Sequence, residues 1–293
     1  MKNTTVDSSR FDGTTSRYTD SNSLHMMKLS YAVYAGTMDT IGAEEDWSIT
    51  EKLVKDAGYR MERFEKRKDI YDPNAMIVWD DDNVFLVFRG TEPTAWNQWA
   101  TDAKIRRKRF CIGKIHQGFS ESVELLWPAL MPCLKDVYLT KKRRLFITGH
   151  SLGAAMSQVA ASRLEFEERL HPTAIYNFGC PRALNCKGAD LYNQRLGART
   201  YRIVNNNDIV CNLPFEWMGY SHVGQFKYIT ADGRLCDDLS YWWLLLDGVW
   251  GGVRALGDLD IIDTVTDHLP QSYLEQLEIL AKLPDPETRP CFM

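Results

Sequence analysis

The sequence has little that would direct it to nucleic acid or hold it across a membrane. Its formal net charge is −4 over 293 residues, which gives no general attraction to a polyanion such as DNA or RNA. Its one membrane-like stretch, residues 239–256, is interrupted by Asp247, Arg254 and three glycines. It also falls short of the roughly 20 apolar residues that span a bilayer. We therefore expect neither a nucleic-acid partner nor a transmembrane segment.

The N-terminus lacks the apolar core of a secretory leader. Residues 1–23 are polar and rich in Ser, Thr and Asp, so we expect a flexible arm there and a protein that is cytoplasmic or is a secreted form without its leader. The interior has no linker rich in Ser, Gly or Pro, although the length would allow two domains. Residues 24–293 are therefore expected to form a single domain.

Cysteines are present, but not in a pattern that binds zinc or builds a disulfide framework. They are seven in number, dispersed and without C-x-x-C spacing, which argues against both. We expect free thiols that pack as small apolar residues, with no metal and no cofactor. Their positions are 111, 133, 180, 186, 211, 236 and 291.

What the sequence does contain is an alternation of short apolar runs and helical patterns. The runs 75–79 and 84–88 are separated by three aspartates and an asparagine, which predicts a hairpin. Further strands are expected at 145–148, 173–178, 199–204 and 220–229, and helices at 24–35, 48–57, 121–137, 152–170 and 271–283. Pro128 and Pro132 should bend or split the third helix. The alternation predicts an α/β fold with helices on both faces of the sheet.

The strand at 145–148 leads into Gly149-His150-Ser151-Leu152-Gly153 and then an alanine-rich helical run. This pattern is typical of the nucleophile elbow, in which a serine lies on a strained strand-to-helix turn with its hydroxyl exposed. A Cβ at either glycine would collide with the neighbouring strand or helix. Ser151 is therefore the candidate nucleophile.

A serine nucleophile needs a histidine that takes its proton and a carboxylate that orients the histidine. The acid should follow a strand at the sheet's carboxyl edge, and Asp208 does so, after a turn of three asparagines. It could also be a surface turn residue. The competing acids follow no clear strand; they are Asp237, Asp238, Asp260 and Asp263.

Two histidines lie downstream of Asp208. His222 sits in an alternating strand pattern and suits a packed core residue, whereas His268 sits in a loop before the last helix. Functional side chains favour loops on a rigid scaffold, so the residues favour His268 without excluding His222.

The tetrahedral oxyanion needs two donors. The backbone N–H of Leu152 lies at the positive end of the helix after the elbow. Thr91, directly after the 84–88 strand, offers an N–H and a hydroxyl, and Gly90 allows close approach of the backbone. The alternative for this segment is a simple turn.

With these residues in place, the chain resembles the class 3 lipases, the family of the filamentous-fungal lipases. Matching motifs run in order from about residue 75 to 283. They are Phe88-Arg89-Gly90-Thr91, Trp99-Ala100-Thr101-Asp102, His116-Gln117-Gly118-Phe119, Gly149 to Ala155, Gly179-Cys180-Pro181-Arg182, Asn207 to Pro214, Tyr220-Ser221-His222, and His268 with Tyr273 and Leu277.

The resemblance implies an α/β-hydrolase fold with a mostly parallel sheet. It implies Asp208 as the acid and His268 as the base, with His222 not catalytic. The chain departs from the family at Cys180, where Ser or Gln is usual, and in the spacing from Arg182 to Asn185. It also shows neither the leader nor the paired cysteines of secreted fungal members.

The family's lid corresponds here to about residues 92–109. This stretch holds Trp96 and Trp99, then a basic run from Lys104 to Arg109. It is either a packed helix with a solvated basic face or an interfacial lid whose tryptophans contact lipid. We expect a serine ester hydrolase of lipase type, with an ester lipid at the lipid-water interface as its partner. The alternatives are a feruloyl-type or short-chain esterase and a lipase-like binding or signalling module without catalysis.

Overall fold

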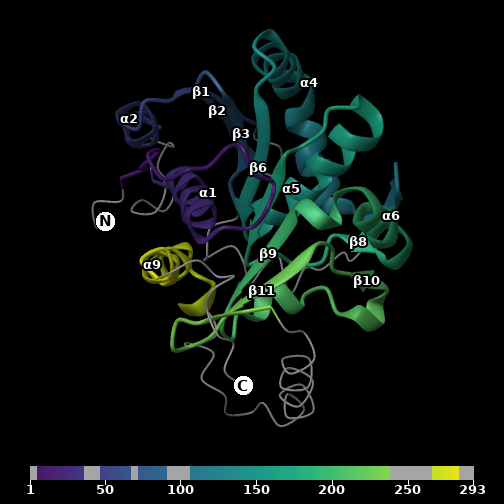
Figure 1. Ribbon diagram of the computed structural model, residues 1–293. Coiled ribbons are helices and arrows are strands. Elements are labelled where there is room, and N and C mark those ends of the chain that lie inside the picture. Colours follow the sequence, from purple (N-terminus) through teal and green to yellow (C-terminus); the bar gives the residue numbers. More distant parts are fainter. Residues whose placement is uncertain (1–4, 36–46, 67–71, 91–105, 238–265, 284–293) are drawn as a thin grey trace.

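A computed structural model describes residues 5–35, 47–66, 72–90, 106–237 and 266–283. Its centre is an eight-stranded sheet in the order β1-β2-β3-β6-β7-β9-β11-β12 (Figure 1). Strands β3, β6, β7, β9 and β11 are parallel, and β1, β2 and β12 are antiparallel at the edges. The predicted α/β class is thereby confirmed. The bounds are β1 Arg60–Glu65, β2 Asn74–Trp79, β3 Asn83–Phe88, β6 Arg144–His150, β7 Ala174–Phe178, β9 Thr200–Asn205, β11 Gln225–Ile229 and β12 Leu235–Cys236.

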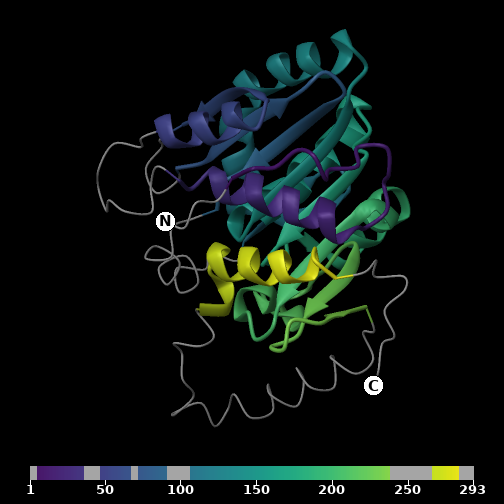
Figure 2. The same cartoon turned by 60° about the vertical axis from the view of Figure 1, so that its left-hand side comes forward.

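Helices cover both faces of this sheet. One face carries α4, α5 and α6, and the other carries α1, α2 and α9; α9 lies beside α1 (Figure 2). Their bounds are α1 Asp20–Ala32, α2 Ser48–Asp56, α4 Gln117–Thr140, α5 Leu152–Arg163, α6 Cys186–Leu196 and α9 Pro270–Leu280. Within the described part of the chain, no helix is both long and apolar enough to cross a membrane, and the cysteines there are free thiols.

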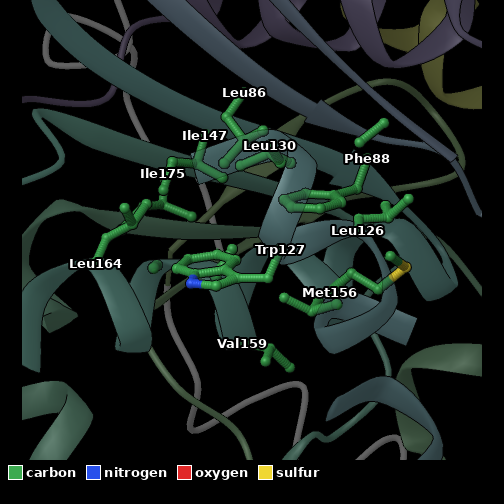
Figure 3. Packing of buried hydrophobic residues seen from close by; sticks show 14 of the residues in the cluster. Leu86, Phe88, Leu126, Trp127, Leu130, Ile147, Met156, Val159, Leu164 and Ile175 are labelled. Atoms are coloured by element: carbon green, nitrogen blue, oxygen red, sulfur yellow. The ribbon is translucent and has the colours of Figure 1, made fainter. Parts of the chain in front are cut away.

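Strand alternation divides the core into two layers. Successive side chains of a strand point to opposite faces, so Leu86 packs with α4 and α5 while its neighbours Phe85 and Val87 pack with α1 and α9. Figure 3 shows the first layer, where Trp127 and Leu130 of α4 meet strand residues that include Leu86. Burial on both faces explains why these strands read as continuous apolar runs.

A second, four-stranded sheet of order β10-β8-β5-β4 was not predicted. Its strands are β4 Arg107–Phe110, β5 Gly113–His116, β8 Leu184–Asn185 and β10 Tyr220–Ser221. The single strand expected at 220–229 is wrong, because β10 and β11 belong to different sheets. Gly224 lies between them with φ +76°, a left-handed conformation that interrupts an extended strand.

Helix α4 is continuous from Gln117 to Thr140 with Pro128 and Pro132 inside it, so the predicted split does not occur. A proline inside a helix removes one backbone hydrogen bond. The helix also buries ten of its residues, and such packing supplies most of the stability of helices in proteins. Tertiary burial thus outweighs the local penalty.

Of the flexible arm expected over 1–23, the structure describes residues 5–23. Most residues before Asp20 are exposed, but Val6, Phe11 and Tyr18 pack against the core, and α1 begins at Asp20. Phe11 stacks edge-on against Phe85 and Phe146, at 5.0 and 4.9 Å between ring centroids. Tyr201 donates to Ser16 O at 2.7 Å. A few aromatic residues within a polar stretch are enough to anchor it, and average composition conceals them.

The buried His25 is expected to make the fold less stable in acid. Its Nδ1 lies 3.1 Å from Asp7 O and its Nε2 3.2 Å from the Tyr59 hydroxyl. Burial lowers the pKa of His25 from 6.5 to about 4. The stabilisation from its neutral form is therefore complete above pH 6.5 and is lost as the pH falls towards 4. When the pH is lowered from about 7 to about 4.5, the unfolding free energy of wild type should fall. That of His25→Asn should fall by about 2 kcal/mol less, because the variant lacks the buried imidazole.

Urea unfolding at the two pH values measures this difference. His171→Asn is the matched control, because the His171 side chain is 60% exposed. Equal pH dependence in His25→Asn and wild type would contradict the assignment of the acid sensitivity to this buried imidazole.

Candidate active site

Ser151 lies at the junction between β6 and α5. Its backbone has φ 58° and ψ −128°, a conformation that costs a non-glycine residue on the order of 1–3 kcal/mol. A hydrogen bond from Ser151 N to Phe178 O of β7, at 2.9 Å, helps to hold it. This is the strained strand-to-helix turn expected from the sequence.

The two flanking glycines are required by close packing. An added Cβ at Gly149 would lie 2.3 Å from the carbonyl carbon of Gly153, and one at Gly153 would lie 2.3 Å from Phe88 O of β3. Both contacts are with backbone, which cannot move aside as a flexible side chain can. The first turn of α5 therefore lies directly against β6 and β3 only because both positions lack a side chain.

The structure brings Ser151, His268 and Asp208 into one hydrogen-bonded chain. His268 Nε2 lies 2.8 Å from Ser151 Oγ, and His268 Nδ1 lies 2.9 Å from each carboxyl oxygen of Asp208. A carboxylate only accepts, so Nδ1 carries the proton and Nε2 is left to accept from the serine hydroxyl. The His268 side chain is 12% exposed, whereas the Asp208 side chain is fully buried. Of this pair, the imidazole is therefore the more accessible to solvent.

Asp208 is buried rather than a surface turn residue, and three donors satisfy it. Besides His268, Val210 N donates to Oδ1 at 2.9 Å and the Tyr273 hydroxyl donates to Oδ2 at 2.6 Å. Burial alone would raise the pKa of Asp208. The charge of His268 and the hydrogen bonds from His268 and Tyr273 outweigh burial and hold that pKa below its ordinary value. The carboxylate is thus kept charged beside the imidazole.

His268 was expected in a loop, but residues 266–268 are helical, and this segment is hydrogen-bonded to the turn after β9. Asn205 Nδ2 donates to Asp267 O at 2.9 Å, and the Asp267 carboxylate accepts from Asn206 Nδ2 at 3.0 Å and from Asn207 N at 3.2 Å. From the sequence, the asparagines predict only a turn. Their contacts with Asp267 depend on a residue far along the chain, so no local signal could have revealed them.

His222 has a different environment. Its Nε2 lies 2.8 Å from the backbone oxygen of Cys211, which belongs to the short helix η3 (Ile209–Asn212) that follows Asp208. Burial, and then the charges of Arg202 and Arg182, hold the pKa of His222 well below its usual range. Among the competing acids, Asp237 forms an ion pair with Lys227 at 2.5 Å. Asp238, Asp260 and Asp263 lie outside the described residues.

Only part of the predicted oxyanion site and lid falls within the described residues. Leu152 is the first residue of α5, where a backbone N–H has no partner within the helix. Thr91, Trp96 and Trp99 lie outside those residues. Of the expected lid, 92–109, the structure describes 106–109, and Arg107–Phe110 forms β4, paired with β5 in the second sheet.

Two polar side chains beside the site were not recognised in the sequence as part of it. The Tyr34 hydroxyl accepts from Gly90 N at 2.9 Å and lies 3.2 Å from His150 Nδ1. His150 Nε2 lies 2.8 Å from the carbonyl oxygen of His268. Tyr34 falls within the helix predicted over 24–35, and its local pattern does not indicate a role at the site. In the part of the chain that the structure describes, no group of three or more His, Cys, Asp or Glu side chains is arranged to hold a metal ion.

A mostly parallel sheet covered on both faces, with a strained serine between a central strand and its following helix, defines an α/β-hydrolase. Residues 85–218 match the family model described as lipase (class 3). The resemblance to the class 3 lipases seen in the motifs is thereby confirmed.

Fungal lipases are among the named relatives of this chain. A secreted mono- and diacylglycerol lipase A from Penicillium cyclopium is 31% identical over 169 residues, covering 55% of this chain and 53% of the relative. A lipase from Rhizopus niveus is 29% identical over 177 residues, covering 56% and 44%. The chain thus spans about half the length of these relatives. The crystal structure of a lipase from Rhizopus microsporus var. chinensis is 26% identical, with a TM-score of 0.58 over 70% of this chain and 74% of that one.

Proposed function

We propose that the chain is a serine carboxylic ester hydrolase that acts on acylglycerol esters at a lipid-water interface. The observation that supports this most directly is the hydrogen-bonded chain Ser151 Oγ–His268–Asp208, with contacts of 2.8 and 2.9 Å. The likeness to the Penicillium mono- and diacylglycerol lipase supports the choice of substrate. That relative is described as secreted, which favours the second of the two locations expected from the sequence.

In the first half of the reaction, Ser151 Oγ attacks the ester carbonyl carbon while His268 Nε2 takes the hydroxyl proton. Asp208 stabilises the imidazolium that forms, because it stays charged and accepts from Nδ1. The N–H of Leu152, with the N–H of Thr91, would stabilise the oxyanion. His268 then returns the proton to the leaving alcohol as the carbon–oxygen bond breaks, which leaves an acyl-serine.

In the second half, water replaces the alcohol. His268 takes a proton from the water, whose oxygen attacks the acyl carbonyl. The tetrahedral intermediate collapses as His268 gives the proton back to Ser151 Oγ, and the carboxylic acid leaves. The scheme uses no metal or cofactor.

The substrate class is testable with nitrophenyl esters of increasing acyl length. We expect catalytic efficiency to rise at least about tenfold from the acetyl to the octanoyl ester, since each buried methylene contributes about 0.8 kcal/mol. With an emulsified glyceride, we expect the rate to rise further once the substrate forms an interface. Both would be measured as initial rates of ester cleavage.

Fastest turnover on acetyl or feruloyl esters, with no gain from an emulsion, would support the soluble-ester alternative instead.

The variants Trp96→Ala and Trp99→Ala distinguish an interfacial lid from a packed helix. An interfacial role predicts loss of activity on the emulsion with little change on a short soluble ester.

A further inference from the structure

A second polar chain runs behind the nucleophile. Tyr34, directly after α1, lies with its hydroxyl 2.9 Å from Gly90 N and 3.2 Å from His150 Nδ1, and His150 Nε2 lies 2.8 Å from His268 O. Tyr34 and His150 are each 2% exposed. These contacts join the segment just before Thr91 to the backbone of the proposed base.

These contacts fit an arrangement in which every proton of this chain points the same way. The carbonyl oxygen of His268 only accepts, so His150 carries its proton on Nε2 and its Nδ1 is an acceptor. The Tyr34 hydroxyl therefore donates to Nδ1, and its oxygen accepts from Gly90 N–H. A 3.5 Å contact from the same hydroxyl to His150 O is longer and competes only weakly. All three hydrogen bonds run in one direction, so each polarises the next.

The environment keeps His150 neutral. Burial, and then the charge of His268, lower the pKa of His150 to about 3. The His150 ring lies 4.8 Å from the His268 ring and 5.5 Å from the Tyr273 ring, measured between centroids. When His268 takes up a proton from Ser151, His150 therefore does not ionise, and the direction of the hydrogen bonds persists.

Gly90 packs closely against Tyr34 and His150. A Cβ at Gly90 would lie 2.2 Å from the Tyr34 hydroxyl oxygen and 2.5 Å from His150 O. The backbone at the end of β3 thus lies directly on Tyr34, one residue before the proposed oxyanion donor. At the other end, the carbonyl that His150 holds belongs to the residue whose side chain contacts Ser151.

We propose that Tyr34 and His150 are positioning residues that fix the oxyanion segment and the base at one distance from each other. This inference rests on the proposed ester hydrolysis. Charge develops in the transition state at both places, on the oxyanion and on the imidazolium, so their spacing affects turnover more than ground-state binding. A displacement of about 1 Å at a catalytic group can cost on the order of 10²-fold in rate.

Tyr34→Phe keeps the buried ring and removes only the hydroxyl. We expect kcat to fall about 10- to 100-fold while KM changes less than about twofold. The readout is the kcat and KM split on a soluble nitrophenyl ester. Tyr201→Phe is the matched control, because Tyr201 is also 2% exposed and its hydroxyl also donates to a backbone oxygen, that of Ser16, away from the site.

Coupling tests whether the two residues act as one unit. His150→Phe removes both of its hydrogen bonds, so adding Tyr34→Phe to it should cost much less than Tyr34→Phe does in wild type. His150→Gln keeps an N–H that can reach His268 O and should recover part of the activity lost in His150→Phe. Additive losses, or equal losses in Tyr34→Phe and Tyr201→Phe, would overturn the proposal.

Wild-type protein separates this failure from failure of the proposed function. If wild type neither cleaves esters nor reacts with a fluorophosphonate probe, the ester hydrolase proposal fails, and the positioning proposal with it. If wild type is active and Tyr34→Phe keeps its full kcat, only the positioning role is wrong.

Discussion

Replacement of Ser151 by alanine is expected to lower kcat for ester hydrolysis by about 10⁶-fold, the scale seen when a serine hydrolase loses its nucleophile. The acyl-enzyme cannot form without the Ser151 oxygen, which lies 2.8 Å from His268 Nε2. Some acceleration over water should remain, because the oxyanion donors and substrate binding are unchanged.

This prediction is measured by active-site titration and by steady-state rates on a nitrophenyl ester. A fluorophosphonate probe should label wild type and fail to label Ser151→Ala. Ser162→Ala is the matched control: Ser162 is also buried, also on the α5 side of the elbow, and its hydroxyl donates to Gln158 O at 2.8 Å. Substantial ester cleavage by folded Ser151→Ala would exclude the proposed mechanism, and an unlabelled wild type would revive the binding-module alternative.

Replacement of His268 by alanine should have an effect of similar size, again about 10⁶-fold in kcat. Without the imidazole, the Ser151 hydroxyl loses the group that would take its proton during attack. The double variant with Ser151→Ala should be no slower than either single variant, because residues that act as a unit give strongly non-additive losses.

His222→Ala is the control for this prediction, since His222 Nε2 contacts Cys211 O and not a member of the Ser151–His268–Asp208 chain. We expect its kcat to stay within about tenfold of wild type, with most of the cost in stability. Circular dichroism and thermal unfolding of both variants would show that each is folded. Loss of turnover in His222→Ala with activity retained in His268→Ala would reverse the assignment of the base.

Much of the fold follows from short-range patterns. The runs 75–79 and 84–88 predict the β2–β3 hairpin to within a residue, because burial on both faces of a strand requires a continuous apolar run. The order strand, glycine, serine, glycine, helix predicts the turn at Ser151. In this turn a Cβ at either glycine would collide with neighbouring backbone. The ordered motifs also identify the class 3 family.

Patterns failed where distant contacts overrode local preferences. Polar composition predicts a flexible arm at the N-terminus, yet Phe11 packs edge-on against the stacked rings of Phe85 and Phe146. Two prolines predict that α4 is bent or split, and the split does not occur because burial of one helix face keeps the helix continuous. Strand β1 was not predicted, because only Phe64 is buried in it and its sequence shows no clear alternation. Its pairing with β2 along its whole length makes it a strand.

By itself, the sequence determined that Ser151 lies on a nucleophile elbow and that the chain resembles the class 3 lipases. Both conclusions depend on short motifs, each made of residues close together in the chain. From the residues alone, two histidines remained possible partners. Only the tertiary structure decided which imidazole lies against Ser151 Oγ, which donors surround Asp208, and that Tyr34 and His150 connect Gly90 to His268. These contacts join segments that are distant along the chain, and packing of α1 and α9 on the sheet creates them.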